Sequence, residues 1–162
     1  MSITFLPHRL DTLATTTLWG LRTTHNLLNM QNAEQWMALR GRLQGSAWAA
    51  PAHWYAVNFY PQDYFSRFAP ENPYDLACCV AADPMATKPD FLAEVVIPAG
   101  LYAVFTYQGL PSAAPFEWIL GSWLPASAYR LAHRPHFEKL PADYRPNNPE
   151  ATEEIWLPID IQ

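Results

Sequence analysis

The apolar residues of this chain occur in short runs separated by proline-rich turns, and this pattern predicts many short elements. Two segments place apolar residues at helical spacing and are predicted to be helices, namely Asn32 to Leu43 and Ala113 to Trp123. Seven segments have the apolar, β-branched or alternating character of strands, namely Leu13 to Arg22, His53 to Tyr60, Tyr74 to Ala81, Phe91 to Ile97, Leu101 to Tyr107, His136 to Leu140 and Glu153 to Ile159. Asn32 is expected to be the N-cap of the first helix, because its side chain can accept a hydrogen bond from the first turn.

The order of these elements indicates a single domain over residues 1–162 with two similar halves. The first half-repeat covers about residues 1–83 and the second about residues 90–162, joined by the connector Asp83 to Pro89. Each half is interpreted as a strand, helix, strand, strand unit. Trp36 and Trp118 support this repeat, because they lie at comparable points of the two helices and each follows an acidic residue closely.

The composition is typical of a folded protein that binds neither nucleic acid nor membrane. Half of the 162 residues are hydrophobic and 15% are charged, whereas a disordered chain would show the reverse. The net charge of −5 and the lack of a Lys/Arg run disfavour direct binding to nucleic acid and suit a cationic ligand better. No apolar stretch approaches the roughly 20 residues of a membrane span, and the N-terminus does not have the pattern of a secretory signal.

The two cysteines, Cys78 and Cys79, are expected to be reduced and buried. Adjacent residues of a strand point to opposite faces, so a disulfide between them would be strained. A reduced pair and the absence of a secretory signal together predict a cytoplasmic protein.

Four motifs follow one another in the second half of the chain. They are V-I-P-A-G-L-Y-A-V from Val96, W-L-P-A-S-A-Y from Trp123, P-H-F-E from Pro135 and the closing segment E-E-I-W-L-P-I from Glu153. In this order they resemble the second half of the gyrase-inhibitory-protein-like small-molecule-binding domain, which also forms the effector-binding part of some multidrug-responsive transcription activators. The resemblance implies an α+β fold in which two pseudo-symmetric strand-helix-strand-strand units form one antiparallel sheet, with a ligand cleft between the two helices.

Glu138 is the principal candidate for a ligand-binding residue. The resemblance implies that the acid of the P-x-F-E motif lies on the pocket floor, where a carboxylate beneath aromatic walls would attract cations. This chain differs from the family in two ways: Leu140 replaces a tyrosine, and His136 shares the face of Glu138 and would neutralise it when protonated. The other interpretation of Glu138 is a surface residue of an edge strand, paired with Lys139 or an arginine.

Aromatic side chains form the second group of candidates, because their faces bind flat or cationic groups. Trp123 and Tyr102 match aromatic positions of the family motifs, so the resemblance implies that both contact ligand. The further aromatic candidates are Trp156, Trp36, Phe59, Trp19, Trp54 and Tyr60. Helical or alternating spacing of aromatics is also typical of a core. No cofactor is expected, and no metal site, because His133 and His136 lack a third ligand.

Three functions remain open. The favoured one is a stand-alone binding protein for amphipathic, aromatic or cationic small molecules, with Glu138 as the polar anchor. The second is a hydrolase of reactive strained-ring genotoxins, an activity that the resemblance implies for some single-domain relatives. Glu138 would then be the base, and Tyr102 or Tyr129 would replace the missing tyrosine. The third is a regulator that binds a protein partner, such as a topoisomerase or another regulator, as the family name suggests.

Overall fold

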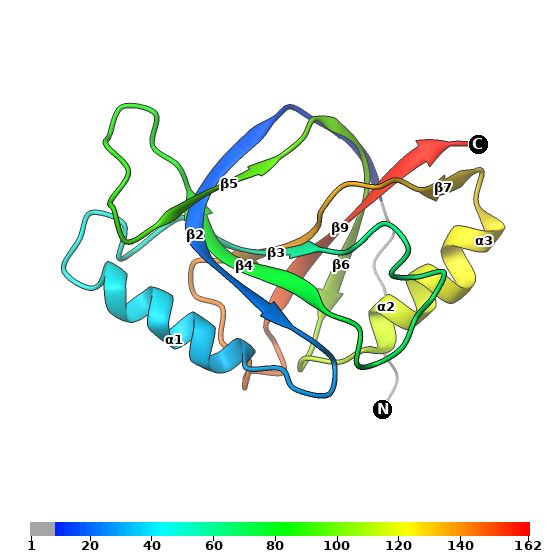
Figure 1. Cartoon of the computed structure of the whole chain (residues 1–162), viewed down its shortest axis with the longest axis horizontal. Coiled ribbons are helices and arrows are strands. Elements are labelled where there is room, and N and C mark those ends of the chain that lie inside the picture. Colours follow the sequence, from blue (N-terminus) through cyan, green and yellow to red (C-terminus); the bar gives the residue numbers. More distant parts are fainter. Residues whose placement is uncertain (1–8) are drawn as a thin grey trace.

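One antiparallel sheet of nine strands dominates residues 9–162, the part of the chain that the computed structural model describes (Figure 1). The strands are β1 (Arg9–Leu13), β2 (Thr16–His25), β3 (His53–Phe59), β4 (Tyr74–Ala81), β5 (Ala93–Ile97), β6 (Gly100–Gln108), β7 (Tyr129–Leu131), β8 (His136–Pro141) and β9 (Thr152–Ile161). The helical segments are α1 (Asn32–Leu43), α2 (Ala114–Trp118), the π-helical turn η1 (Ile119–Trp123) and α3 (Leu124–Ala126). The fold is therefore α+β, as predicted.

The sheet is curled, and its topology requires this shape. The strand order is β1-β6-β9-β8-β3-β4-β2-β5, with β7 paired to β9 outside this path. Strands β5 and β6 lie near opposite ends of this order, yet only Pro98 and Ala99 separate them in the chain. Two residues span only about 10 Å between the flanking Cα atoms, so the two ends of the sheet must approach each other. Figure 1 shows the resulting ring of strands above the helices.

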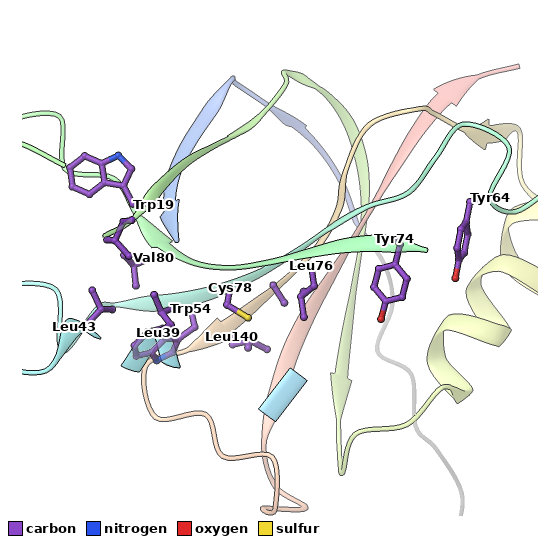
Figure 2. Close-up of a cluster of buried hydrophobic side chains, with 12 residues drawn as sticks. Trp19, Leu39, Leu43, Trp54, Tyr64, Tyr74, Leu76, Cys78, Val80 and Leu140 are labelled. Carbon is purple, nitrogen blue, oxygen red and sulfur yellow. The ribbon is translucent and has the colours of Figure 1, made fainter. Parts of the chain in front are cut away.

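The two faces of the curled sheet bury different clusters. The concave face, called here the closed face, packs residues from both ends of the sheet against one another: Leu18, Val57, Ala77, Cys79, Val95, Ile97, Tyr102, Val104, Phe137 and Trp156. The other face, called here the helix face, carries α1 on one half and the α2–η1 segment on the other (Figure 1). Leu39 and Leu43 of α1 are fully buried there, and so is Ile119 of η1. Figure 2 shows the cluster beneath α1, which follows β4 from Val80 to Tyr74.

The sequence pattern predicted most elements correctly. Both Asn32–Leu43 and Tyr74–Ala81 have the predicted bounds, and the seven predicted strands are all present. Two strands were missed: β1 is a largely exposed edge strand, and β7 has only three residues. The predicted helix at 113–123 is divided, because it continues through a π-helical turn into α3.

The predicted capping role of Asn32 is wrong. Asn32 is the first residue of α1, Gln31 holds the N-cap position without a side-chain cap, and the Asn32 Oδ1 atom is buried without a partner. The cysteine prediction is confirmed: Cys78 and Cys79 are free, fully buried and directed to opposite faces.

A buried polar contact attaches the start of α1 to the sheet. Gln35 Nε2 donates hydrogen bonds to the carbonyl oxygens of Leu21 at 2.9 Å and Leu76 at 2.7 Å. The backbone N–H of Gln31 donates to His25 Nδ1 at 3.3 Å, which leaves His25 Nε2 to donate to Gln35 Oε1 at 2.6 Å. Both Gln35 and His25 are buried, so these bonds replace contacts with water.

Replacing Gln35 by methionine is expected to lower the free energy of unfolding by about 2 kcal/mol. Methionine matches the length of glutamine but leaves two carbonyls and one imidazole N–H unpaired in the interior. Chemical denaturation monitored by tryptophan fluorescence measures the effect. Glu34→Gln, at an exposed position of the same helix turn, should change stability by less than about 0.5 kcal/mol. Equal stabilities of the two variants would contradict the role of Gln35.

Candidate ligand-binding site

Glu138 occupies the centre of the helix face. On β8 its register partners are Ala56 of β3 and Ile155 of β9. Ala56 belongs to the apolar cluster beneath α1, and Ile155 belongs to the cluster beneath η1. Glu138 therefore lies on the line where the two helix-bearing halves meet. The edge-strand interpretation of Glu138 is wrong, because β8 is paired on both sides.

A second acid, Glu153, lies next to Glu138. Glu153 is two residues before Ile155 on β9, so it points to the same face as the register partner of Glu138. The two carboxyl groups are within hydrogen-bonding reach of each other. Both side chains are partly buried. Because an ionised carboxylate has no donor, a hydrogen bond between two carboxyl groups requires that one of them keeps its proton.

The surroundings raise the pKa of both acids. Burial and then the nearby charge of Glu153 raise the pKa of Glu138 well above its usual range. Burial also raises the pKa of Glu153 to about 7, although the hydrogen bond from Glu138 acts in the opposite direction. The Glu138 side chain is only partly buried, but burial is the largest cause of the rise in its pKa. The carboxyl group is therefore poorly solvated.

Tyrosines from three different segments lie near enough to Glu138 to feel its charge. Tyr60 follows β3, Tyr74 begins β4 and Tyr144 follows β8. Burial is the main cause that raises the pKa of each phenol, that of Tyr144 to about 12. The charge of Glu138 contributes at all three phenols, and at Tyr144 the charge of Glu153 contributes more than that of Glu138. The phenols therefore remain protonated and can donate O–H hydrogen bonds. The ring centroids of Tyr60 and Tyr74 are 5.4 Å apart, and Tyr64 extends this aromatic wall at 4.7 Å from Tyr60 (Figure 2 shows Tyr74 and Tyr64).

His136 does not neutralise Glu138, contrary to the expectation from the sequence. Its ring stacks on Phe65 with centroids 5.4 Å apart and meets the edge of Tyr60 at 4.9 Å. Burial in this aromatic contact, with a smaller effect of His133, lowers the pKa of His136 to about 3. The imidazole is therefore neutral at physiological pH, and Glu138 receives no positive charge from it.

Five of the predicted aromatics lie on the helix face. Trp19 and Trp54 are buried in the cluster beneath α1, Trp36 and Tyr60 pack against it, and Trp123 packs against the cluster beneath η1. Trp36 of α1 is partly buried and meets the edge of Trp54 at a centroid distance of 6.1 Å. Trp123 of η1 is partly buried as well, stacked at 6.4 Å from Tyr129 and edge-on to Phe105 at 5.0 Å. Each helix thus places one tryptophan on the same face as Glu138.

Tyr102, Trp156 and Phe59 belong to the opposite, closed face, so the structure does not bring them to Glu138. Tyr102 is fully buried, and its hydroxyl donates to the Pro135 carbonyl at 3.2 Å. Trp156 is stacked on Phe137, and Phe59 packs under the guanidinium of Arg22. A catalytic pair of Tyr102 and Glu138 is therefore wrong, because the sheet separates the two side chains.

The sequence did not indicate Glu153, Tyr74 or Tyr144 as site residues. It also suggested that no phenol lies close to Glu138, because Leu140 replaces the tyrosine that the family often has two residues after the acid. Leu140 is buried in the cluster beneath α1, and the phenols near Glu138 come from other segments. The alternation in E-E-I-W shows that Glu153 and Ile155 share a face. Only the β8–β9 register shows that this face is that of Glu138.

Two cavities are found in the described part of the protein. A small one of about 70 Å³ lies behind Tyr60, Phe65 and His136 and is also lined by Arg134. A wider groove of about 580 Å³ runs between α1, the end of β2 and residues 90–93. Glu138 lines neither of these two spaces. Within residues 9–162, no group of three or more His, Cys, Asp or Glu side chains could hold a metal ion. The helices of the same residues are all too short or too polar to cross a membrane.

A single antiparallel sheet of nine strands with one helix-bearing face is consistent with the fold of effector-binding domains of the gyrase-inhibitory-protein-like class. The family comparison agrees with this class. Residues 9–159 match the family described as "Cass2: Integron-associated effector binding protein", and the chain belongs to this family. The resemblance inferred from the four motifs is thereby confirmed, and binding of small-molecule effectors is the function at the level of the family.

Solved structures share the fold at low sequence identity. SAV2435 bound to tetraphenylphosphonium is 18% identical, with a TM-score of 0.61 and coverage of 96% of this chain and 94% of that chain. An integron cassette protein of Vibrio cholerae is 14% identical, with a TM-score of 0.61 and coverage of 99% and 100%. A hydrolase of Listeria innocua is 11% identical, with a TM-score of 0.59 and coverage of 94% and 91%. None of the curated proteins is significantly similar in sequence to this chain.

Proposed function

We propose that the protein binds amphipathic aromatic cations on the helix face, with Glu138 as the charged anchor and tyrosines as the walls. The observation that carries this proposal is the partly buried acid pair of Glu138 and Glu153 on the helix face, whose charge is felt by the phenols of Tyr60, Tyr74 and Tyr144. Family membership independently supports a small-molecule ligand. One structure of the same fold, that of SAV2435, was solved with a lipophilic cation.

The electrostatics favour a positive charge in the ligand. Burial and the neighbouring Glu153 raise the pKa of Glu138. Among the described residues, no positive charge contributes to this shift. An ionised carboxylate without a counter-ion is costly in a poorly solvated environment, and a ligand cation would remove that cost. The phenol rings add π faces, each of which contributes roughly 0.5–2 kcal/mol to the binding of an organic cation.

Replacing Glu138 by glutamine is expected to weaken the binding of tetraphenylphosphonium by about 10- to 150-fold, or roughly 1.5–3 kcal/mol, because a charge-assisted contact is lost while the shape is kept. Triphenylphosphine oxide, a neutral probe with the same aromatic groups, should lose little affinity. Isothermal titration calorimetry or quenching of tryptophan fluorescence measures both. Glu154→Gln is the matched control, because it removes the same charge from the opposite face of β9 and should change both affinities by less than about twofold.

A hydrolase is the second candidate function, favoured by the phenols of Tyr60, Tyr74 and Tyr144 beside a carboxyl of raised pKa. In that case, Glu138→Gln should leave probe binding nearly intact and should lower the hydrolysis of an epoxide or aziridine by about 10²- to 10⁴-fold, the usual share of a positioned base. Small and equal effects on cationic, neutral and reactive compounds would contradict both functions.

A further inference from the structure

The geometry of the acid pair is fixed by strand pairing rather than by flexible loops. Glu138 is held opposite Ile155 by the β8–β9 register, and Glu153 is held opposite Tyr107 by the β6–β9 register. The two carboxyl groups are therefore diagonal neighbours on one face of two paired strands. Their hydrogen bond needs one proton, so the pair carries a single negative charge when it holds this one shared proton.

Within residues 9–162, no positively charged group is among the causes that shift the pKa of Glu138 or Glu153. The groups close enough to the pair to interact with it are uncharged. They are Tyr60 after β3, Tyr74 and Cys78 on β4, Tyr144 after β8 and Tyr107 on β6. Burial raises the pKa of the Tyr60, Tyr74 and Tyr144 phenols and of the Cys78 thiol, so these four groups remain protonated and neutral at physiological pH. His136, the nearest imidazole on β8, is neutral as well. A bound cation would thus meet the charge of the acid pair alone.

We propose that Glu138 and Glu153 act as one proton-sharing acid pair, so that the site takes singly charged lipophilic cations and releases one proton to solvent when it binds them under mildly acidic conditions. This inference rests on the proposed function and adds the charge of the ligand and the proton balance. The empty pair with two protons is neutral. Entry of a cation with one positive charge expels one proton, and the remaining proton joins the two carboxyl groups.

The pH dependence of binding follows from this balance. The pKa of Glu153, about 7, separates the two regimes. Below this pH the affinity for a monocation should rise about tenfold per pH unit, because one proton leaves for each cation bound. Above it the pair already carries one negative charge, and affinity should level off. A dication would have to displace the last shared proton as well, so the site should prefer one positive charge.

Calorimetric titration of the wild-type protein with tetraphenylphosphonium, in buffers of different ionisation enthalpy, counts the released protons. The expected result is about one proton at about pH 6 and close to none at about pH 8.5. Triphenylphosphine oxide should release none at either pH. Binding of the cation without proton release at pH 6 would overturn the proton-sharing pair but leave the proposed function intact. If neither probe binds at any pH, the proposed function itself fails, and this inference fails with it.

Two variants assign the protons to the pair. Glu138→Gln combined with Glu153→Gln should abolish proton release while retaining the neutral probe, which also shows that the site is folded. Proton release that persists in this double variant would assign it to other groups and overturn the inference. Infrared difference spectra of the complex provide a second readout: the wild type should show a carboxylic acid C=O band that disappears in Glu153→Gln. A wild-type complex without this band would also overturn the pair.

Discussion

Replacing Gly20 by alanine is expected to destabilise the protein by about 3–5 kcal/mol, enough to prevent stable folding in a marginally stable domain. Gly20 lies on β2 opposite Cys79 of β4. A Cβ atom at this position would collide with the backbone carbonyl oxygen of Cys78 and would come within 2.7 Å of the Cys79 Sγ atom. The carbonyl belongs to the central strand β4, which is paired on both sides and cannot move without disturbing the sheet. Thermal and chemical denaturation measure the loss.

Gly41→Ala is the matched control, with an effect of the opposite sign. Gly41 lies within α1, and a Cβ atom there would meet no atom within 4 Å. Alanine in a helix interior is more favourable than glycine by roughly 0.5–1 kcal/mol, so this variant should be slightly more stable than the wild type. If Gly20→Ala proved as stable as Gly41→Ala, the close approach of β2 and β4 would be refuted.

Titration of Glu153 is expected to remove about 3 kcal/mol of stability from the ligand-free protein as the pH rises from below 4.5 to above 7, and the raised pKa of Glu138 adds to this loss. The usual pKa of a glutamate is 4.5, and burial raises that of Glu153 to about 7 in the folded protein. Between these values the unfolded chain releases the proton while the folded protein retains it, so stability falls with increasing pH. Below pH 4.5 both states are protonated and the loss is absent. The size follows from about 1.4 kcal/mol for each pKa unit.

Glu153→Gln tests this dependence directly, because the amide keeps the shape but does not ionise. At about pH 8.5 the variant should be more stable than the wild type by about 2–3 kcal/mol, and at about pH 4 the two proteins should be equally stable. Glu117→Gln, at an exposed position of α2, should change stability by less than about 0.5 kcal/mol at either pH. Stabilities that differ by the same amount at both pH values would show that Glu153 does not titrate abnormally.

The local pattern of apolar and polar residues was sufficient to predict most of the helices and strands. The helical spacing of apolar residues predicted α1 correctly, because the residues at that spacing, Leu39 and Leu43, are the ones that the helix buries against the sheet. Alternation determined that Cys78 and Cys79 point to opposite faces, which the two separate clusters confirm. Short or exposed strands such as β1 and β7 have too few alternating positions for the pattern to distinguish them from loops.

The contents of the site were harder to predict. Glu138 was singled out through its motif, and the structure places it on the helix face between the clusters beneath α1 and η1. Tyr102 and Trp156 also matched expected aromatic positions, but both point to the closed face. Motif matching identifies a position along the chain, whereas the side of the sheet depends on where each strand pairs and in which register.

The sequence by itself determined the α+β class, the helix α1, the reduced cysteines and the family, and it singled out Glu138 as a candidate ligand-binding residue. Each of these depends on residues that are close together in the chain or on an ordered motif. Only the tertiary structure decided that Glu153 is the neighbour of Glu138, that the phenols near Glu138 are those of Tyr60, Tyr74 and Tyr144, and that burial lowers the pKa of His136. Those features depend on strand register and on burial by distant segments, and neither is encoded in the local alternation of polar and apolar residues.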